Sequence, residues 1–322
     1  MEPYRSNPYT DYQQFLYSII KCLHDKRIMG MVIDITYNGR MINKNLKIKK
    51  KSDPFPYVII DNFFTDEFFL ELEKNFPIAS DFTINNVGRM HFDTTYGDNL
   101  YNELLTKSKT YQDLHDWVYG EDFIKYFFDL FDDDLGNQID LIGSPKEFDI
   151  RYDPVEVGEV FDKNNFQKEA LKPYLYPRID LGCGKKNYGI STGGKGPHID
   201  NPQRLISILV YVGGFENMTG GEHRIYKKSS DNLQVFESIK PIKNRLIASL
   251  QNNDAFHDVN PVVEIDGQRN AFYLAISSSK KIWQSCERNK FNINYNKNRV
   301  ESSFLRKTLN RIKGLIKHIL IH

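Results

Sequence analysis

The sequence lacks the features that mark secreted, membrane-spanning and nucleic-acid-binding proteins. Its 322 residues include three cysteines, Cys22, Cys183 and Cys286, whose spacing fits neither a disulfide framework nor a zinc site, so we expect a reducing, cytoplasmic location. The chain begins without a basic and then apolar signal, and no run of about 18 apolar residues predicts a transmembrane segment. Its 43 basic and 42 acidic side chains nearly cancel, so no nucleic-acid partner is expected.

What the sequence does have, after about residue 145, is a series of short β-rich runs. Glycine, proline, asparagine and aspartate separate these runs, and no helical pattern lies between them. Such a series predicts an antiparallel sandwich or barrel. The expected strands span residues 175–181, 205–212, 223–227, 233–239, 246–250, 259–265 and 271–276.

The first part of the chain predicts helices with a few strands among them. Residues 12–23 carry apolar side chains at helical spacing, and residues 57–60 have the pattern of a buried strand. Thr65 is a candidate helix cap, and residues 123–131 form an aromatic-rich helical pattern. The acidic residues 132–134 lack the spacing of a calcium loop, so we expect them to be solvated.

The end of the chain, residues 304–321, predicts an amphipathic helix. It can pack on the body of the protein, pair with a second subunit as a homodimer, or make a peripheral contact with an anionic membrane. Apolar stripes are more often covered by protein than by lipid, so we favour the first two readings. The apolar stripe consists of Leu305, Leu309, Ile312, Ile316 and Ile319.

Candidate metal ligands lie in the β-rich part. In an extended segment, His198 and Asp200 project from the same side of the chain. His257, from a distant strand, can complete a 2-His-1-carboxylate set, which leaves positions open on Fe(II). Any one of these residues alone is more often structural, and the same triplet recurs at His91-Phe92-Asp93, so the pattern needs support from its surroundings.

That support comes from an ordered set of residues around the triplet. The set consists of Tyr188, Pro197–Pro202, Leu209–Tyr211, Gly220–Glu222, His257–Val262 and Arg269. In this order it resembles the prolyl-4-hydroxylase-like branch of the 2-oxoglutarate/Fe(II)-dependent oxygenases. The resemblance covers about residues 174–280 and departs in a slightly longer gap between His257 and Arg269.

The resemblance implies a fold and a division of the chain. The expected core is mainly β, a double-stranded β-helix (jelly roll, cupin-like), with N-terminal helices and strands wrapped around it and a C-terminal amphipathic helix, α+β overall. We expect an N-terminal helical and mixed region at 1–145, the oxygenase domain at 146–285, and a linker with the final helix at 286–322. Residues 77–173 match no recognised pattern.

The resemblance also implies the cofactors and the roles of the site residues. His198, Asp200 and His257 would bind Fe(II), with 2-oxoglutarate as cosubstrate and O2 as oxidant. Arg269 would pair with the C5 carboxylate of 2-oxoglutarate and Tyr211 would add a hydrogen bond. The remaining positions would line the cosubstrate site, and Ser207 and Leu209 share a strand face with Tyr211 by alternation. These lining positions are Tyr188, Ser207 and Leu209.

The expected activity is that of a dioxygenase, most simply a hydroxylase, on a small-molecule or peptidyl substrate. The intact carboxylate of Asp200 favours hydroxylation, since related halogenases carry a small residue there. Desaturation and cyclisation use the same ligands and stay open. Two alternatives keep the fold: a cupin-like non-oxidative metal enzyme, which does not need Arg269 or Tyr211, and a catalytically silent binding module. His223 is a candidate neighbour of the site.

Overall fold

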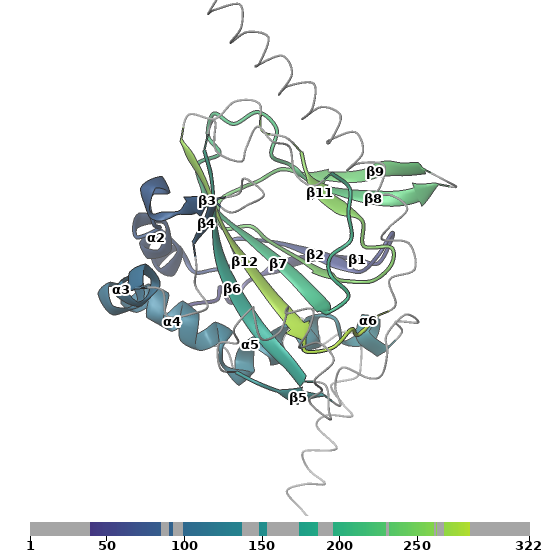
Figure 1. Cartoon of the computed structure of the whole chain (residues 1–322), viewed down its shortest axis with the longest axis horizontal. Coiled ribbons are helices and arrows are strands. Elements are labelled where there is room, and N and C mark those ends of the chain that lie inside the picture. Colours follow the sequence, from purple (N-terminus) through teal and green to yellow (C-terminus); the bar gives the residue numbers. More distant parts are fainter. Residues whose placement is uncertain are drawn as a thin grey trace, which may run out of the picture.

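The computed structural model describes residues 39–84, 90–92, 99–136, 148–152, 174–185, 196–229, 232–260, 262 and 267–283. The expected helix at 12–23, the expected tail helix at 304–321 and Tyr188 lie outside these residues. In the described part, strands form two sheets and helices lie beside the larger one (Figure 1). None of these helices has the length and apolar character needed to cross a bilayer.

The larger sheet has nine strands among the described residues, in the order β1-β2-β10-β7-β12-β6-β4-β3, with β5 beside β6. All its pairings are antiparallel except that of β5 with β6. Its strands are β1 (Lys47–Lys51), β2 (Tyr57–Asp61), β3 (Thr83–Ile84), β4 (Met90–Phe92), β5 (Asp149–Ile150), β6 (Tyr174–Lys185), β7 (Arg204–Gly213), β10 (Leu246–Leu250) and β12 (Gln268–Ser278).

The smaller sheet has the order β11-β8-β9 and is antiparallel. It consists of β8 (His223–Ser229), β9 (Asn232–Ile239) and β11 (His257–Val259). An isolated bridge between His198 and His257 brings the segment before β7 alongside β11. Together the two sheets make the β-rich jelly-roll core that the sequence predicts.

Alternate residues of the central strands supply two apolar clusters, one on each face of the larger sheet. Tyr57, Leu209 and Ile247 belong to a cluster shared with Ile225 and Ile239 of the smaller sheet, so this is the interior between the sheets. Their neighbours along the strands belong to a second cluster shared with the helices. Both faces of these strands are therefore covered, and every residue of β10 is buried.

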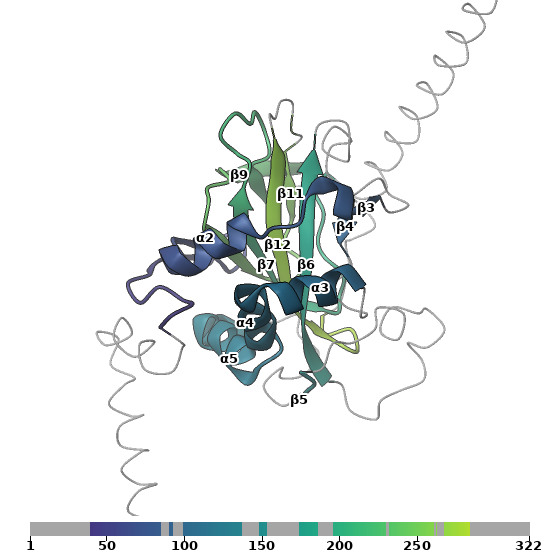
Figure 2. The same ribbon diagram turned by 90° about the vertical axis from the view of Figure 1, so that its left-hand side faces the viewer.

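Five α-helices and one 3-10 turn lie in the described residues before β5, and Figure 2 shows α2 to α5 in front of the strands of the larger sheet. Aromatic side chains supply most of the contact: Phe123 and Phe127 are fully buried, and Tyr111 packs against Phe272 of β12. These elements are α2 (Asp66–Lys74), η1 (Ala79–Asp81), α3 (Asn99–Lys107), α4 (Lys109–Val118), α5 (Glu121–Leu130) and α6 (Asp132–Gly136).

Strands from both ends of the described sequence share the larger sheet. Strand β2 pairs with β10, and β4 pairs with β6, although β2 and β4 come from the part of the chain before residue 145. The early strands are thus hydrogen-bonded members of the sheet that also contains β7 and β12.

Two local predictions are wrong. The strand expected at 259–265 is instead β11 (His257–Val259), which begins two residues earlier; Asn260 and Val262 lie in no strand, and residues 261 and 263–265 lie outside the described residues. The acidic run at 132–134 is not wholly solvated. Asp134 forms an ion pair with Lys50 of β1 at 2.8 Å, and its side chain is 12% exposed.

Candidate metal centre

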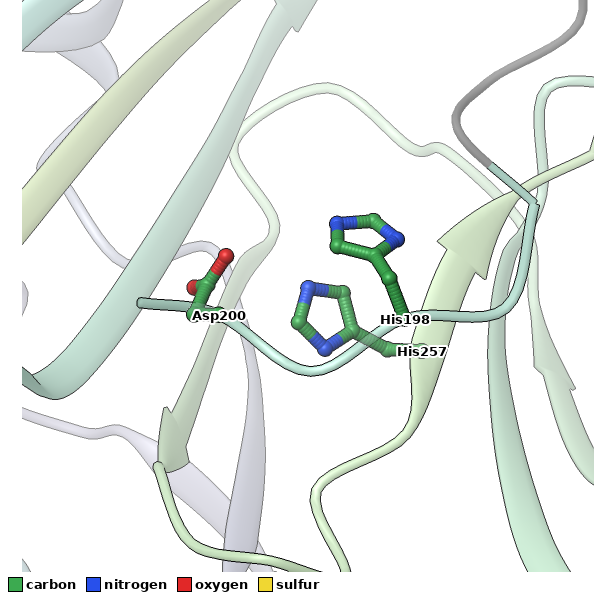
Figure 3. A group of neighbouring side chains, drawn as sticks. All are labelled: His198, Asp200 and His257. Carbon is green, nitrogen blue, oxygen red and sulfur yellow. The ribbon is translucent and has the colours of Figure 1, made fainter. Parts of the chain in front are cut away.

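The three predicted ligands come together at one edge of the space between the sheets. His198 and Asp200 lie on the segment leading into β7, and His257 is the first residue of β11. One ligand atom from each residue lies within 4.8 Å of the other two, and Figure 3 shows the three side chains converging. The backbone sets this approach: the amide of His198 donates to His257 O at 3.0 Å, and the amide of His257 donates to His198 O at 2.9 Å.

Backbone carbonyls fix both imidazole rings. Nδ1 of His198 lies 2.8 Å from the carbonyl oxygen of Gly196, and Nδ1 of His257 lies 2.9 Å from that of Ala255. Gly196 has a φ of 69°, which a residue with a side chain seldom adopts. A hydrogen on Nδ1 that is donated to a carbonyl leaves the lone pair on Nε2, the arrangement of a metal-binding histidine.

The carboxylate of Asp200 stays ionised although it is partly buried. Burial opposes ionisation, but the positive charges of His257, Arg204 and His198 hold the pKa of this carboxyl well below its usual range. The Ser207 hydroxyl also donates a hydrogen bond to it, with the same effect. Asp200 therefore offers a negatively charged oxygen beside the two imidazole rings.

A buried cation faces the same interior from the larger sheet. Arg269, on β12, is 7% exposed, and its guanidinium carbon lies 5.5 Å from the ring centre of Tyr211 on β7. Its Nη1 donates to the Tyr273 hydroxyl at 3.4 Å, whereas Nε and Nη2 have no hydrogen-bond partner among the described residues. Within that part of the chain no carboxylate forms an ion pair with Arg269. A buried guanidinium without a counterion is costly, so this position suits an anionic ligand.

Tyr211 is fully buried beside this arginine. Burial raises the pKa of its phenol to about 12, against the opposing effect of the Arg269 charge, so the hydroxyl is protonated and able to donate. That hydroxyl has no hydrogen-bond partner in the described residues. Leu209, two residues earlier on β7, is 7% exposed in the same apolar cluster. The expected shared face of Ser207, Leu209 and Tyr211 is thus present.

His223 also lies at this site. It is 8% exposed, and its ring lies 5.5 Å from that of His257 with 27° between the planes. Burial first, and then the positive charges of His257 and His198, lower the pKa of His223 to about 3. The imidazole is therefore neutral.

A buried ion pair on the other side of β11 supports His257. Asp258 is 1% exposed and accepts hydrogen bonds from Arg224 Nε at 2.7 Å, from Arg224 Nη2 at 2.6 Å, and from the Tyr226 hydroxyl at 3.0 Å. These contacts join β11 to β8. We did not predict them, because Asp258 could be recognised as a partner only once the pairing of β8 with β11 was known.

A second unpredicted pair lies on β6. Ile179 and Leu181 face the helices, so Arg178 and Asp180 alternate to the opposite face, toward the interior. Arg178 Nη2 lies 3.0 Å from a carboxylate oxygen of Asp180, and both side chains are mostly buried. In the sequence, the alternation of charged and apolar residues at 178–181 could have indicated that Arg178 and Asp180 share one face of a strand. By contrast, His91 lies on β4, away from the segments that carry the triad.

The residues present fit a divalent iron with a dicarboxylate beside it. Two imidazoles with fixed Nδ1 atoms and one ionised carboxylate are the donors of a facial triad. The unpaired guanidinium atoms of Arg269 and the free hydroxyl of Tyr211 match a carboxylate group.

Comparison with known families agrees with this chemistry. Residues 185–275 match the model of the 2OG-Fe(II) oxygenase superfamily, and this segment contains the triad, Tyr211 and Arg269. Over this segment the chain is therefore similar to the 2OG-Fe(II) oxygenases, as the sequence predicts, and enzymes of this superfamily use Fe(II), 2-oxoglutarate and O2. No curated protein matches the chain.

Three solved structures are similar to the chain at low identity. A prolyl 4-hydroxylase from Phytophthora capsici is 16% identical over 69% of this chain and 58% of that one, with a TM-score of 0.37. A Trichoplax adhaerens prolyl hydroxylase, in complex with a hypoxia inducible factor peptide fragment, is 17% identical over 69% and 83%, with a TM-score of 0.38. A Burkholderia pseudomallei oxidoreductase of the 2OG-Fe(II) oxygenase family is 10% identical over 74% and 76%, with a TM-score of 0.31. The chain thus spans under two thirds of the Phytophthora enzyme, and at these TM-scores the likeness identifies no substrate.

Proposed function

We propose that this protein is an Fe(II)- and 2-oxoglutarate-dependent dioxygenase of the hydroxylase type, with His198, Asp200 and His257 as the iron ligands. The observation that carries the proposal is the buried, uncompensated guanidinium of Arg269 in the same interior as the triad. A metal site alone does not require such a cation, whereas a site that binds a dicarboxylate does. This argues against a cupin-like non-oxidative enzyme.

Bound iron, 2-oxoglutarate and O2 supply the oxidising power: 2-oxoglutarate is decarboxylated to succinate while a C–H bond of the substrate is oxidised. The residues of the chain would bind and orient these groups. The triad would occupy three coordination positions of the metal and leave the others for ligands. Arg269 offers two parallel donors that fix one carboxylate, and Tyr211 offers a third. The apolar cluster around Leu209 keeps water away from these charged contacts, which strengthens them.

For the substrate, we propose a polar compound: a small metabolite, an amino acid, a sugar or a peptidyl residue. The Arg178–Asp180 pair supports this, because it places two charged groups on the interior face of β6. In the sheet register, Ala275 lies between Arg178 and Ser207, so two strand spacings, about 10 Å, separate Arg178 from the hydroxyl partner of Asp200. A succinate-release screen over amino acids, nucleotide sugars and peptides tests this, and Arg178→Met should weaken the response to the active compound.

The class of enzyme can be tested without a substrate. Anaerobic protein with Fe(II) should develop a weak visible charge-transfer band when 2-oxoglutarate is added. His198→Ala, Asp200→Ala and His257→Ala should each abolish iron binding and the band. His91→Ala, which removes the histidine of the other His-x-Asp triplet, is the matched control and should keep both.

Two results would count against the proposal. A wild-type protein that binds Fe(II) but shows no band with 2-oxoglutarate would be a non-oxidative metal enzyme or a binding module. Loss of iron in His91→Ala with retention in His198→Ala would show that the triad is wrongly assigned.

A further inference from the structure

Three buried side chains beside the triad, Arg269, Tyr211 and His223, carry polar atoms that have no hydrogen-bond partner among the described residues. Arg269 can only donate, and two of its nitrogens have no partner among the described residues. The buried Tyr211 hydroxyl likewise has none. A metal ion held by the triad would add further positive charge. The missing complement is therefore a ligand rich in acceptor oxygens.

His223 is the third of these side chains. Its Nδ1 is buried and has no hydrogen-bond partner in the described residues. Its cross-strand neighbours are Ile239 on β9 and Val259 on β11, and the next inward side chain on β8 is Ile225, so its own sheet surrounds it with apolar groups. Leaving a buried imidazole nitrogen in such surroundings without a hydrogen bond destabilises the fold, unless a bound molecule forms that hydrogen bond.

The position of His223 directs it toward the cosubstrate. Its ring stacks on that of His257, with 5.5 Å between the ring centres. Ile225, two residues on along the same face of β8, belongs to the apolar cluster that contains Tyr211, so His223 lies beside a metal ligand and on the face that meets the proposed cosubstrate site. A fourth metal ligand at this place would fill a position that the cosubstrate and O2 need.

We propose that His223 is a cosubstrate-binding residue that donates a hydrogen bond to a carboxylate oxygen of 2-oxoglutarate, beside Arg269 and Tyr211. This inference rests on the proposed function. It assigns to His223 a role in the affinity for the dicarboxylate and none in the affinity for the metal. An imidazole suits the task because a ring N–H can be directed at a carboxylate oxygen.

The test separates affinity for 2-oxoglutarate from affinity for metal. His223→Leu removes both nitrogens and keeps an apolar side chain, and His223→Gln keeps a nitrogen donor. Val235→Ala, at an exposed position on β9 of the same sheet, is the control. For each variant, 2-oxoglutarate is titrated into the anaerobic Fe(II) protein by the visible band, and Mn2+ affinity is measured by calorimetry. We expect His223→Leu to weaken 2-oxoglutarate binding about tenfold or more, the size of one hydrogen bond to a charged group, with Mn2+ affinity unchanged. His223→Gln should recover much of the loss, and Val235→Ala should bind as the wild type does.

Each other outcome decides against His223. Equal 2-oxoglutarate affinity in wild type and both His223 variants would show that the histidine is structural. A loss of Mn2+ affinity in His223→Leu would make it a metal ligand. If His223→Leu does not fold, His223→Phe takes its place, because it keeps a ring and also lacks a donor. A folded His223→Phe that binds Mn2+ and 2-oxoglutarate as the wild type does would overturn the contact. A wild type that binds Mn2+ but no 2-oxoglutarate would instead refute the proposed function itself.

Discussion

Replacing Asp258 by asparagine should destabilise the small sheet at the metal centre. The change keeps the shape of the side chain but replaces one carboxylate oxygen by an amide, which then faces a guanidinium that can only donate. In the structure this carboxylate accepts two hydrogen bonds from Arg224 and one from Tyr226, and it is 1% exposed. Breaking a buried ion pair typically costs about 3–5 kcal/mol. Because Arg224 is 24% exposed and can recover some hydration, we expect the free energy of unfolding to fall by about 2–3 kcal/mol.

A matched control lies four residues earlier. Asp254 pairs with Lys228 at 2.8 Å, but its side chain is 54% exposed, so Asp254→Asn should cost under about 1 kcal/mol. Urea denaturation of the metal-free proteins, followed by circular dichroism, gives both values. Iron affinity should also fall in Asp258→Asn, because β11 is three residues long and begins with His257. Equal stability of the two variants would refute the argument that burial makes the Asp258 pair strong.

Two further predictions concern the cosubstrate and the tail. Arg269→Lys keeps the charge but loses the two-pronged geometry, so 2-oxoglutarate affinity should fall markedly while iron binding survives; Tyr211→Phe removes one hydrogen bond, typically worth about 0.5–1.5 kcal/mol, and should have the milder effect. An unchanged 2-oxoglutarate titration in Arg269→Ala would contradict the assignment. Deleting residues 303–322 should lower thermal stability or dissociate an oligomer while folded enzyme still turns over 2-oxoglutarate. A truncated protein that keeps its stability and oligomeric state and loses only liposome binding would show that lipid covers the tail.

The sequence predicted the central strands well because both of their faces are apolar. The expected strand at 246–250 has the same bounds as β10, in which every residue is buried. Strands β6 and β12 are longer than expected at both ends. The added residues are set by pairing between the two strands, Gln268 with Lys185 and Ser278 with Leu175, and no pattern within either segment reveals such a partner.

For the site, the metal ligands could be predicted from the sequence, but the residues packed around them could not. The spacing of His198 and Asp200 predicted that both face one way, and the ordered motifs around them predicted the superfamily, which the family match confirms. The interior position of His223 and the strength of the Asp258 contacts depend on which strand lies next to which. That register appears only in the folded sheets.

The backbone bridge between His198 and His257 has a consequence for dynamics. The two residues are about sixty positions apart in the chain, and two mutual amide–carbonyl bonds join their segments at that point. An ion bound by both imidazoles would act as a removable crosslink across this seam, restricting its local opening. The two amides should then exchange with deuterium more slowly when the metal is loaded, so hydrogen exchange at a single pair of residues would report occupancy of the centre even before any substrate is known.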